Sequence, residues 1–339
     1  RTEEAATYVA GLPTKGRVAG GDQQVASAFF DGSQRAGDNV LLTASARIDR
    51  WHQGEGRIHE FLLASGATTI NEVSAPRSGT EGSGRLGAMW QPAPAVFLRA
   101  AGYRSWRLPT LNELYRPYRV GASAVAANPQ LKPESLVGGE ASISYQPVAA
   151  VNLSLTGFWN RMDDLIANVT LASGPGNFPQ VGFVSAAGFY SQRQNVAEIE
   201  SKGLEAEAKL PIGPFDLRGS LAYVHARVKG GPTSGFRPTQ APELSGSLTL
   251  GWEQDGFELL GTLRHFGARY EDDRNTRRLP ASTTIDASIA IPLFESTQLV
   301  FSAENLTDSE SPVGFSGTEF ERGQPRTFWG GVRWVPGRR

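Results

Sequence analysis

Apolar and polar residues alternate with period two over most of the chain, from about residue 24 to residue 335. In 40–49, valine, leucine, alanine and isoleucine occupy the even positions, whereas the odd positions include Thr43, Ser45, Arg47 and Asp49. Successive side chains of a β-strand point to opposite faces, so this pattern predicts an all-β protein whose strands have one apolar face. The same alternation recurs in 139–145, 151–160, 204–210, 244–252 and 285–291.

Two features of the alternation favour a membrane wall over a soluble sheet. The polar face carries ionised groups such as Arg47, Asp49 and Glu205, and the apolar face is rich in glycine and alanine. A lipid-facing wall tolerates small residues because it has no protein core to fill. Aromatic residues also gather near the predicted strand ends, where girdles at the two membrane interfaces would place them. These are Trp51, Trp90, Trp106, Tyr145, Trp159, Trp252, Phe257, Tyr270, Phe328 and Trp334.

The predicted connections alternate strictly between short turns and long polar loops. Outer-membrane barrels have short periplasmic turns and long outside loops. We therefore predict a transmembrane antiparallel up-and-down β-barrel, with residues 1–23 as the tail of an outside loop or a partial strand and 336–339 as a short tail. The 52–82 loop could carry a hairpin of its own. The barrel portion, 24–335, has about 13 predicted strands: 24–33, 38–51, 83–92, 94–106, 136–147, 149–162, 195–211, 214–229, 241–254, 257–271, 280–292, 296–306 and 325–335.

Composition narrows the class further. The formal net charge is −1, which argues against nucleic acid as a partner because phosphate binding needs a basic excess. No cysteine is present, so disulfides and thiolate metal sites are excluded. The chain has no run of about 18 apolar residues, so no transmembrane helix is predicted. A barrel remains possible because its strands are short and only every second residue is apolar. The start at Arg1 shows no signal peptide, as expected of an exported chain that is processed or truncated.

Five motifs in order resemble the TonB-dependent receptor family of Gram-negative outer membranes. Arg104-Ser-Trp-Arg-Leu-Pro-Thr-Leu-Asn-Glu-Leu-Tyr115 resembles the family's F-R-x-P-T-L-x-E-L-Y, with Trp106 in place of the phenylalanine. Ala127-Asn-Pro-Gln-Leu-Lys-Pro-Glu134 is similar to N-P-x-L-x-P-E. Asn195 followed by the G-x-E at 203–205, the N-L-x-D at 305–308 and the P-R-T at 325–327 complete the series.

Most motif residues are expected to shape the loop backbone rather than to touch a ligand, because proline fixes φ and asparagine and aspartate bond their own backbone. Arg326 is expected to pair with an acid. Family barrels have about twenty-two strands around an N-terminal plug, so the resemblance implies the C-terminal part of such a barrel, without the plug and the TonB-contacting segment. The motif residues are Pro109, Glu113, Leu114, Asn128, Pro129, Leu131, Pro133, Glu134, Asn305, Leu306, Asp308, Pro325 and Arg326.

The resemblance implies energy-coupled uptake of a scarce, bulky nutrient such as a ferric siderophore, cobalamin, haem or a glycan. The implied partners are outer-membrane lipid, the chain's own plug, the TonB complex acting through that plug, and the nutrient. For the nutrient we single out aromatic and arginine residues of two outside loops, because they suit a flat or anionic ligand; packing among the loops is an equally good reading. They are Arg107, Tyr115, Arg116, Tyr118, Arg119, Phe189, Tyr190 and Arg193.

The polar face of the predicted strands would line the lumen and hold the plug by hydrogen bonds and ion pairs. The residues expected there are Arg47, Asp49, Glu140, Asn152, Asn160, Glu205, Glu207, Asp286, Glu304 and Arg333.

No catalytic constellation stands out, so we expect no enzyme and no cofactor. The histidines lack metal-ligand spacing, although Asp163-Asp164 and Asp272-Asp273 at outer strand ends could hold Ca²⁺. The main alternative is a passive porin-like channel, which has no reason to carry the five motifs. A barrel enzyme would need a cluster such as His265 with Ser288, and a soluble structural β protein is the remaining alternative.

Overall fold

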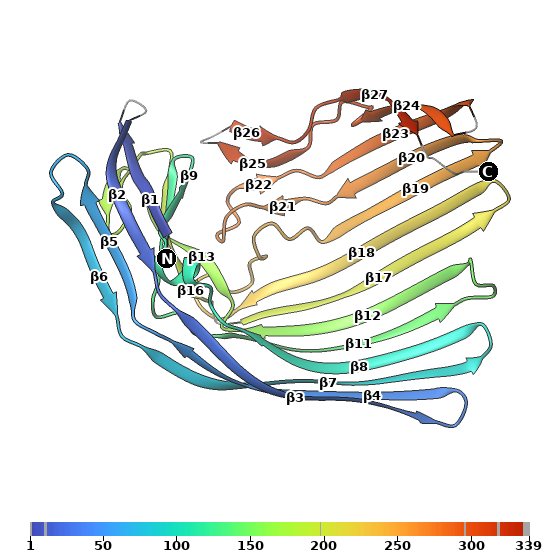
Figure 1. Cartoon of the computed structure of the whole chain (residues 1–339), viewed down its shortest axis with the longest axis horizontal. Coiled ribbons are helices and arrows are strands. Elements are labelled where there is room, and N and C mark those ends of the chain that lie inside the picture. Colours follow the sequence, from blue (N-terminus) through green and yellow to red (C-terminus); the bar gives the residue numbers. More distant parts are fainter. Residues whose placement is uncertain (1, 10–11, 197, 295, 317–318, 335–339) are drawn as a thin grey trace.

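The computed structural model describes residues 2–9, 12–196, 198–294, 296–316 and 319–334; the predicted tail lies outside them. Thirteen strands form one antiparallel sheet in the order β27-β24-β23-β20-β19-β18-β17-β12-β11-β8-β7-β4-β3, which confirms the predicted number. Figure 1 shows this sheet as a curved trough with β3 and β27 at its two edges. Its strands are β3 (Gln23–Ala36), β4 (Val40–Gln53), β7 (Arg77–Ala93), β8 (Val96–Arg107), β11 (Glu134–Tyr145), β12 (Asn152–Asp163), β17 (Glu198–Ile212), β18 (Phe215–Lys229), β19 (Leu244–Gln254), β20 (Phe257–Phe266), β23 (Ser282–Phe294), β24 (Thr297–Glu304) and β27 (Thr327–Trp334).

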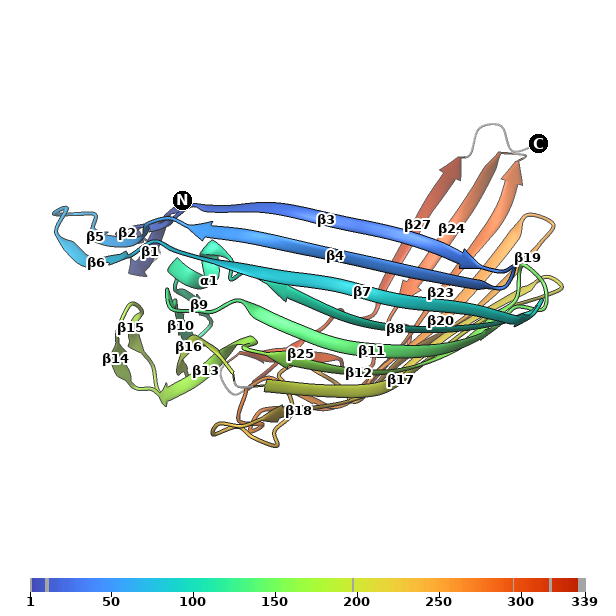
Figure 2. The ribbon, with the colours of Figure 1, turned by 90° about the horizontal axis from the view of Figure 1, so that it is seen from below.

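The connections at the two ends of the sheet differ as predicted. Each strand pairs with the next sheet strand along the chain, so the connections alternate between the two ends. Residues 94–95 join β7 to β8 and 213–214 join β17 to β18, whereas 108–133 join β8 to β11. Figure 2 shows the short turns together at one end and the long connections at the other. The long-connection end is the outside end of an outer-membrane barrel.

The strand register keeps polar and apolar side chains on separate faces. Directly opposed residues of an antiparallel pair point to the same side. Leu155 is opposite Ile143 and Ala206, and all three lie on the apolar face. Thr156 is opposite Ser142 and Glu205, on the polar face. The apolar side chains remain exposed, with Leu155 at 46% and Leu86 at 69%, as expected of a wall that faces lipid.

Aromatic residues of the apolar face gather near the short turns. Trp90 is opposite Val40 at the start of β4, and Phe215 is opposite Trp252. This arrangement is the girdle expected at one membrane interface. Trp51 differs from the prediction: it is 7% exposed, at the outer end of β4. The residues of the girdle are Trp90, Tyr145, Phe215, Trp252, Phe257 and Trp334.

The segments beyond the outside end of the sheet fold into smaller elements, which we call the outer cap. A four-stranded sheet, β1-β2-β5-β6, includes residues that were predicted as an outside loop or partial strand, and β5 with β6 forms the hairpin expected within 52–82. A second sheet has the order β13-β16-β10-β9. The cap elements are β1 (Thr2–Val9), β2 (Leu12–Gly20), β5 (Gly56–Leu62), β6 (Thr68–Ser74), α1 (Leu111–Tyr115), β9 (Tyr118–Val120), β10 (Ser123–Ala126), β13 (Ile166–Ser173), β14 (Gly176–Phe178), β15 (Gly182–Val184), β16 (Phe189–Asn195), β21 (Arg269–Tyr270), β22 (Arg278–Leu279), β25 (Pro312–Ser316) and β26 (Glu319–Arg322).

Helical structure is scarce. Among the described residues, α1 spans Leu111–Tyr115, and no helix is long and apolar enough to cross a membrane.

Candidate ligand cavity at the outer loops

Helix α1 is held in place by a capping box and by a cluster of three charged residues, Arg107, Glu113 and Glu134, which we call the charged hub. Thr110 accepts a hydrogen bond from the Glu113 amide at 3.2 Å, and the Glu113 carboxylate accepts one from the Thr110 amide at 2.8 Å. Arg107 donates to Glu113 at 2.8 Å and also to Glu134, which in turn accepts from the Ile166 amide at 2.6 Å. Burial raises the pKa of Glu113, but the hydrogen bonds from Arg107 and Thr110 lower that pKa below its usual value.

Beneath this hub lies an apolar core that joins α1 to the four-stranded sheet. Leu114, Leu131 and Ile58 are almost fully buried, and Tyr115 is 2% exposed. The Tyr115 ring lies so close to Gly56 that a Cβ there would meet it at 2.1 Å. Burial raises the pKa of the Tyr115 hydroxyl. Tyr115 therefore packs the cap core and is out of reach of a ligand at the surface.

A second core lies under the β14–β15 hairpin. The Tyr190 ring stacks on Phe178 with ring centroids 4.5 Å apart, and Val184 is fully buried beside them. Parallel pairing of β10 with β16 brings Ala124 opposite Tyr190. This pairing joins two connections that are separated by a barrel hairpin in sequence.

The outer cap also contains a cavity of about 650 Å³. Residues of four outer connections line it, and so do Ile199 and Val228 at the outer ends of β17 and β18. Ile199 and Val228 are opposite each other and alternate with Glu200 and Arg227 on the other face. Their positions place them on the same side as Glu205, so the cavity lies over the polar face of the barrel wall.

Arginine and aromatic side chains form one part of the cavity lining. The Arg193 guanidinium lies 4.8 Å from the centre of the Tyr118 ring, and Arg277 lies 4.9 Å from that of Phe189. Arg237, a further lining residue, lies 5.5 Å from the ring centre of Tyr270. Cation–π geometry holds each guanidinium in place. The cavity therefore offers fixed positive groups and ring faces together.

Carboxylates form another part of the lining. Asp273 accepts from the Thr170 hydroxyl at 2.8 Å, which joins two outer connections. Asp272 accepts from the Arg277 amide at 2.6 Å. Burial raises the pKa of Glu271, whose Oε2 atom is buried with no hydrogen-bond partner among the described residues. The cavity is thus bipolar, with the arginines beside the acids.

Comparisons with known proteins identify the fold. Residues 2–306 match the family model described as TonB dependent receptor-like, beta-barrel. The chain belongs to this family. The iron-regulated outer membrane virulence protein of Vibrio cholerae is 26% identical over 270 residues, which cover 77% of this chain and 40% of that protein. The vitamin B12 transporter of Photobacterium profundum is 25% identical over 277 residues, covering 82% of this chain and 40% of its own length.

A solved member of the family has the same fold. The ferric yersiniabactin uptake receptor from Yersinia pestis superposes with a TM-score of 0.72 at 15% identity, over 96% of this chain and 48% of that one. The chain thus spans less than half the length of these relatives. Membership confirms the predicted β-barrel class and the outer-membrane localisation.

Within this TonB-dependent receptor fold, the ligand residues expected from sequence divide into two groups. Tyr118, Phe189 and Arg193 line the cavity. The others are absent from its lining and contribute instead to packing and loop contacts. Arg119 donates to the Phe183 carbonyl at 2.6 Å, and the Arg116 carbonyl accepts from Arg193 at 3.0 Å. The second group comprises Arg107, Tyr115, Arg116, Arg119 and Tyr190.

Sequence reasoning missed Arg237 and Arg277, and it singled out Asp273 only as a possible calcium ligand. These residues come from the connections between β18 and β19 and between β20 and β23. Their clustered charges were the available signal, but nothing in the sequence brings these loops beside Phe189 or Thr170.

The predicted lumen residues lie on the polar face of the receptor wall, and most have partners within that wall. Arg47 bonds Asp49 at 2.7 Å, and Glu140 bonds Arg85 at 2.6 Å. The remaining contacts run from Arg333 to Glu258 at 2.6 Å, from Asn160 to Tyr103 at 3.0 Å, from Asn152 to Gln146 at 3.0 Å, from Asp286 to Arg264, and from Glu304 to Gln324. Glu205 and Glu207 are exposed, and neither has a hydrogen bond or ion pair among the described residues.

The family motifs shape the junctions between wall and cap. Asn305 has φ of 49° and is 4% exposed. Its side chain donates to the carbonyls of Ser309 at 3.0 Å and Gln324 at 3.1 Å, and accepts from the Ser309 amide at 2.9 Å. Arg326 reaches Asp308 across 3.7 Å. The other motif residues lie in the α1 core and hub, around the Asn128 turn, or beside Asn305: Pro109, Glu113, Leu114, Asn128, Pro129, Leu131, Pro133, Glu134, Leu306 and Pro325.

Calcium binding at the outer carboxylates remains a prediction. Asp163 is paired with Arg161 at 2.9 Å, and Asp272 accepts from Thr276 and Arg277. In the described part of the chain, no group of three or more histidine, cysteine, aspartate or glutamate residues could hold a metal ion. His265 and Ser288 lie on opposite faces of the wall, because His265 is opposite Thr283 and Ser288 is opposite Leu260.

Proposed function

We propose that the protein is an outer-membrane uptake receptor that binds a bulky, anionic or flat nutrient in the outer cavity. The observation that carries this proposal is the lining of that cavity by Arg193 on Tyr118 and Arg277 on Phe189, within a receptor-family barrel. Relatives are named for iron regulation, vitamin B12 and ferrioxamine. A flat or anionic nutrient suits guanidinium and aromatic partners.

The proposed transport is energy-coupled. The nutrient would pass from the cavity through the lumen when the TonB complex acts on a plug. Glu205 and Glu207, which are exposed on the polar face, would meet basic or hydroxyl groups of that plug. The position of the cavity over the polar face supports this route, because a bound nutrient would already lie at the outer mouth of the lumen.

The proposal is tested by uptake in cells that make the natural full-length protein. A panel of radiolabelled ferric chelates, haem and cobalamin is supplied under iron limitation, with and without a protonophore. We expect one class to be taken up only when the membrane is energised. The double variant Tyr118→Ala/Phe189→Ala should raise the half-saturating concentration about thirtyfold, since each of the two ring contacts contributes about 1 kcal/mol.

Phe183→Ala is the matched control, because Phe183 is an exposed cap aromatic outside the cavity lining. It should leave uptake unchanged. Wild-type affinity in the folded double variant would refute the cavity as the binding site. Uptake that proceeds equally in the presence of protonophore would refute energy coupling and favour the porin-like alternative.

A further inference from the structure

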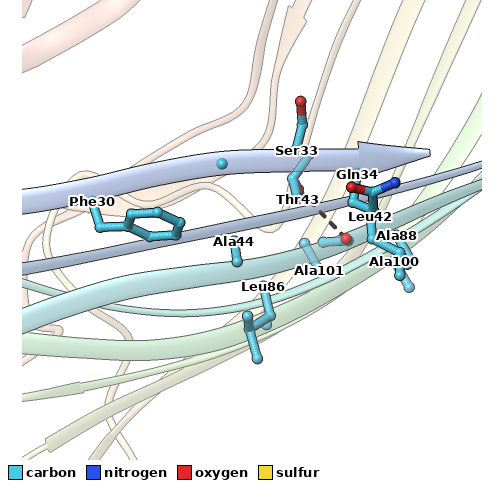
Figure 3. Close-up of a pocket in the computed structure, with 13 residues that line it drawn as sticks. Phe30, Ser33, Gln34, Leu42, Thr43, Ala44, Leu86, Ala88, Ala100 and Ala101 are labelled. Atoms are coloured by element: carbon cyan, nitrogen blue, oxygen red, sulfur yellow. Dashed lines mark hydrogen bonds between the residues drawn. The ribbon is translucent and has the colours of Figure 1, made fainter. Parts of the chain in front are cut away.

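The apolar face of the barrel wall is hollowed where β3, β4, β7 and β8 lie side by side. The hollow measures about 770 Å³ and has an apolar lining. Phe30, Leu42 and Leu86 contribute its large side chains, and Ala44, Ala88 and Ala100 its shallow floor (Figure 3). Ala44 is opposite Leu86, and Ala88 is opposite Ala100, so these residues share the lipid-facing side of the wall.

A cation lies at the outer end of the same strands and on the same face. Arg50, six residues beyond Ala44 on β4, is exposed and donates to Thr80 at 3.1 Å and to Ser78 at 3.4 Å. No ion pair with a carboxylate is found for Arg50 among the described residues. Arg161, also exposed near an outer strand end, differs because it is neutralised by Asp163 at 2.9 Å and Glu198 at 3.2 Å. Arg50 thus presents an uncompensated charge beside two hydroxyls.

The spacing between the hollow and Arg50 matches one leaflet of the bilayer. Val40 marks the aromatic girdle, because it is opposite Trp90. Arg50 lies about 33 Å further along the strand, or about 25 Å along the membrane normal at the usual barrel tilt, which is the height of the apolar band. Ala44 then lies about 15 Å below Arg50, which is half of the ~30 Å hydrocarbon core.

We infer that this face binds an anionic, phosphate-bearing lipid of the outer leaflet. The phosphate accepts from Arg50, with Ser78 and Thr80 beside it, and an acyl chain ends in the hollow. Guanidinium and hydroxyl donors match a phosphate, whereas a second copy of this wall would bring another Arg50 or more apolar surface and leave the charge unmatched. The inference rests on the membrane placement of the wall and is independent of the cargo.

The test uses the natural full-length protein purified in mild detergent. Native mass spectrometry counts bound phosphatidylglycerol, the anionic probe, during a titration; phosphatidylcholine is the zwitterionic comparison. Arg50→Gln removes the cation and Ala44→Phe fills the hollow. Each variant should weaken phosphatidylglycerol binding about tenfold. Arg161→Gln is the matched control and should bind as the wild type does.

Each remaining outcome overturns the inference. Wild-type binding by both Arg50→Gln and Ala44→Phe would show that the hollow and the cation bind no lipid. An equal loss of phosphatidylglycerol binding in Arg161→Gln would show that Arg50 acts only as one of many positive charges at the outer strand ends. Conversion of dimers to monomers by Ala44→Phe, with lipid binding intact, would make a second copy the occupant. A heat-resistant band in gel electrophoresis shows that each variant is folded. If Arg50→Gln or Ala44→Phe does not fold, Arg50→Thr or Ala44→Leu takes its place.

Discussion

The barrel wall and the outer cap bury their apolar side chains in opposite ways. In the wall, Leu86 and Leu155 point outward and are 69% and 46% exposed. In the cap, Leu114 and Leu131 are fully buried in a core. Lipid is the apolar solvent for the wall, so its leucines need no protein partner, whereas the cap stands in water and must build its own interior. Apolar side chains of the same chain therefore face lipid in the wall and fill a protein core in the cap. The boundary between the two regions lies at the outer strand ends.

The largest expected effect comes from opening the cap core. Leu114→Ala should destabilise the cap locally by about 3 to 5 kcal/mol, because a fully buried leucine leaves a cavity. Hydrogen exchange of residues 108–133 in the purified full-length protein would measure this as an acceleration of at least about a hundredfold. Leu86→Ala, the matched change in the wall, should cost about 0.5 kcal/mol. Equal effects at the two leucines would contradict the contrast between wall and cap.

A charge on the lipid face tests the wall. Leu155→Arg should destabilise the folded barrel by about 2 to 4 kcal/mol, since Leu155 lies mid-strand on the face that contacts hydrocarbon. Urea unfolding in detergent or lipid vesicles measures the change. Thr156→Arg, one residue along, points to the polar face directly opposite Glu205 and should be tolerated. Greater damage from Thr156→Arg would mean that the two faces are assigned the wrong way round.

The wall could be predicted from sequence because the features that determine it, the alternation within each strand and the length of each loop, are local in the sequence. Period two alone assigns a face to each residue, and the long–short rhythm of loops gives the strand order and the outside end. Strand boundaries were less accurate: the strand predicted over 257–271 ends at Phe266, and β21 begins after a break at Arg269. The aromatic girdle was correct at Trp90 and Trp252 but wrong at Trp51, which packs at the outer strand end instead of facing lipid.

The cap could not be predicted to the same depth because its contacts are long-range. Tyr115 and Tyr190 were chosen as ligand residues for being aromatic loop positions, yet they pack against Gly56 and Phe178. The parallel pairing of β10 with β16 has no local signal. Of the aromatic and arginine residues expected from sequence to contact the nutrient, Tyr118, Phe189 and Arg193 line the cavity and the other five do not.

The smallest expected effect concerns the charge that joins cap to wall at Glu113. Its pKa is lowered in the folded state, since hydrogen bonds from Arg107 and Thr110 outweigh the effect of burial. Folding therefore favours the ionised form of Glu113. The stability that this ionisation contributes is present above the ordinary pKa of 4.5, and it is lost as the pH falls through the lowered pKa of the folded state. Protease protection of α1 should decline below about pH 4.5.

The variant Glu113→Gln keeps a capping oxygen but not the charge. It should lower the stability of α1 at pH 7 by about 1 kcal/mol and flatten the decline of protection in acid. Glu55→Gln, at an exposed acid on the same side of the molecule, should leave the pH profile intact. An unchanged acid slope in Glu113→Gln would mean that the charge of Glu113 does not control how the cap is attached.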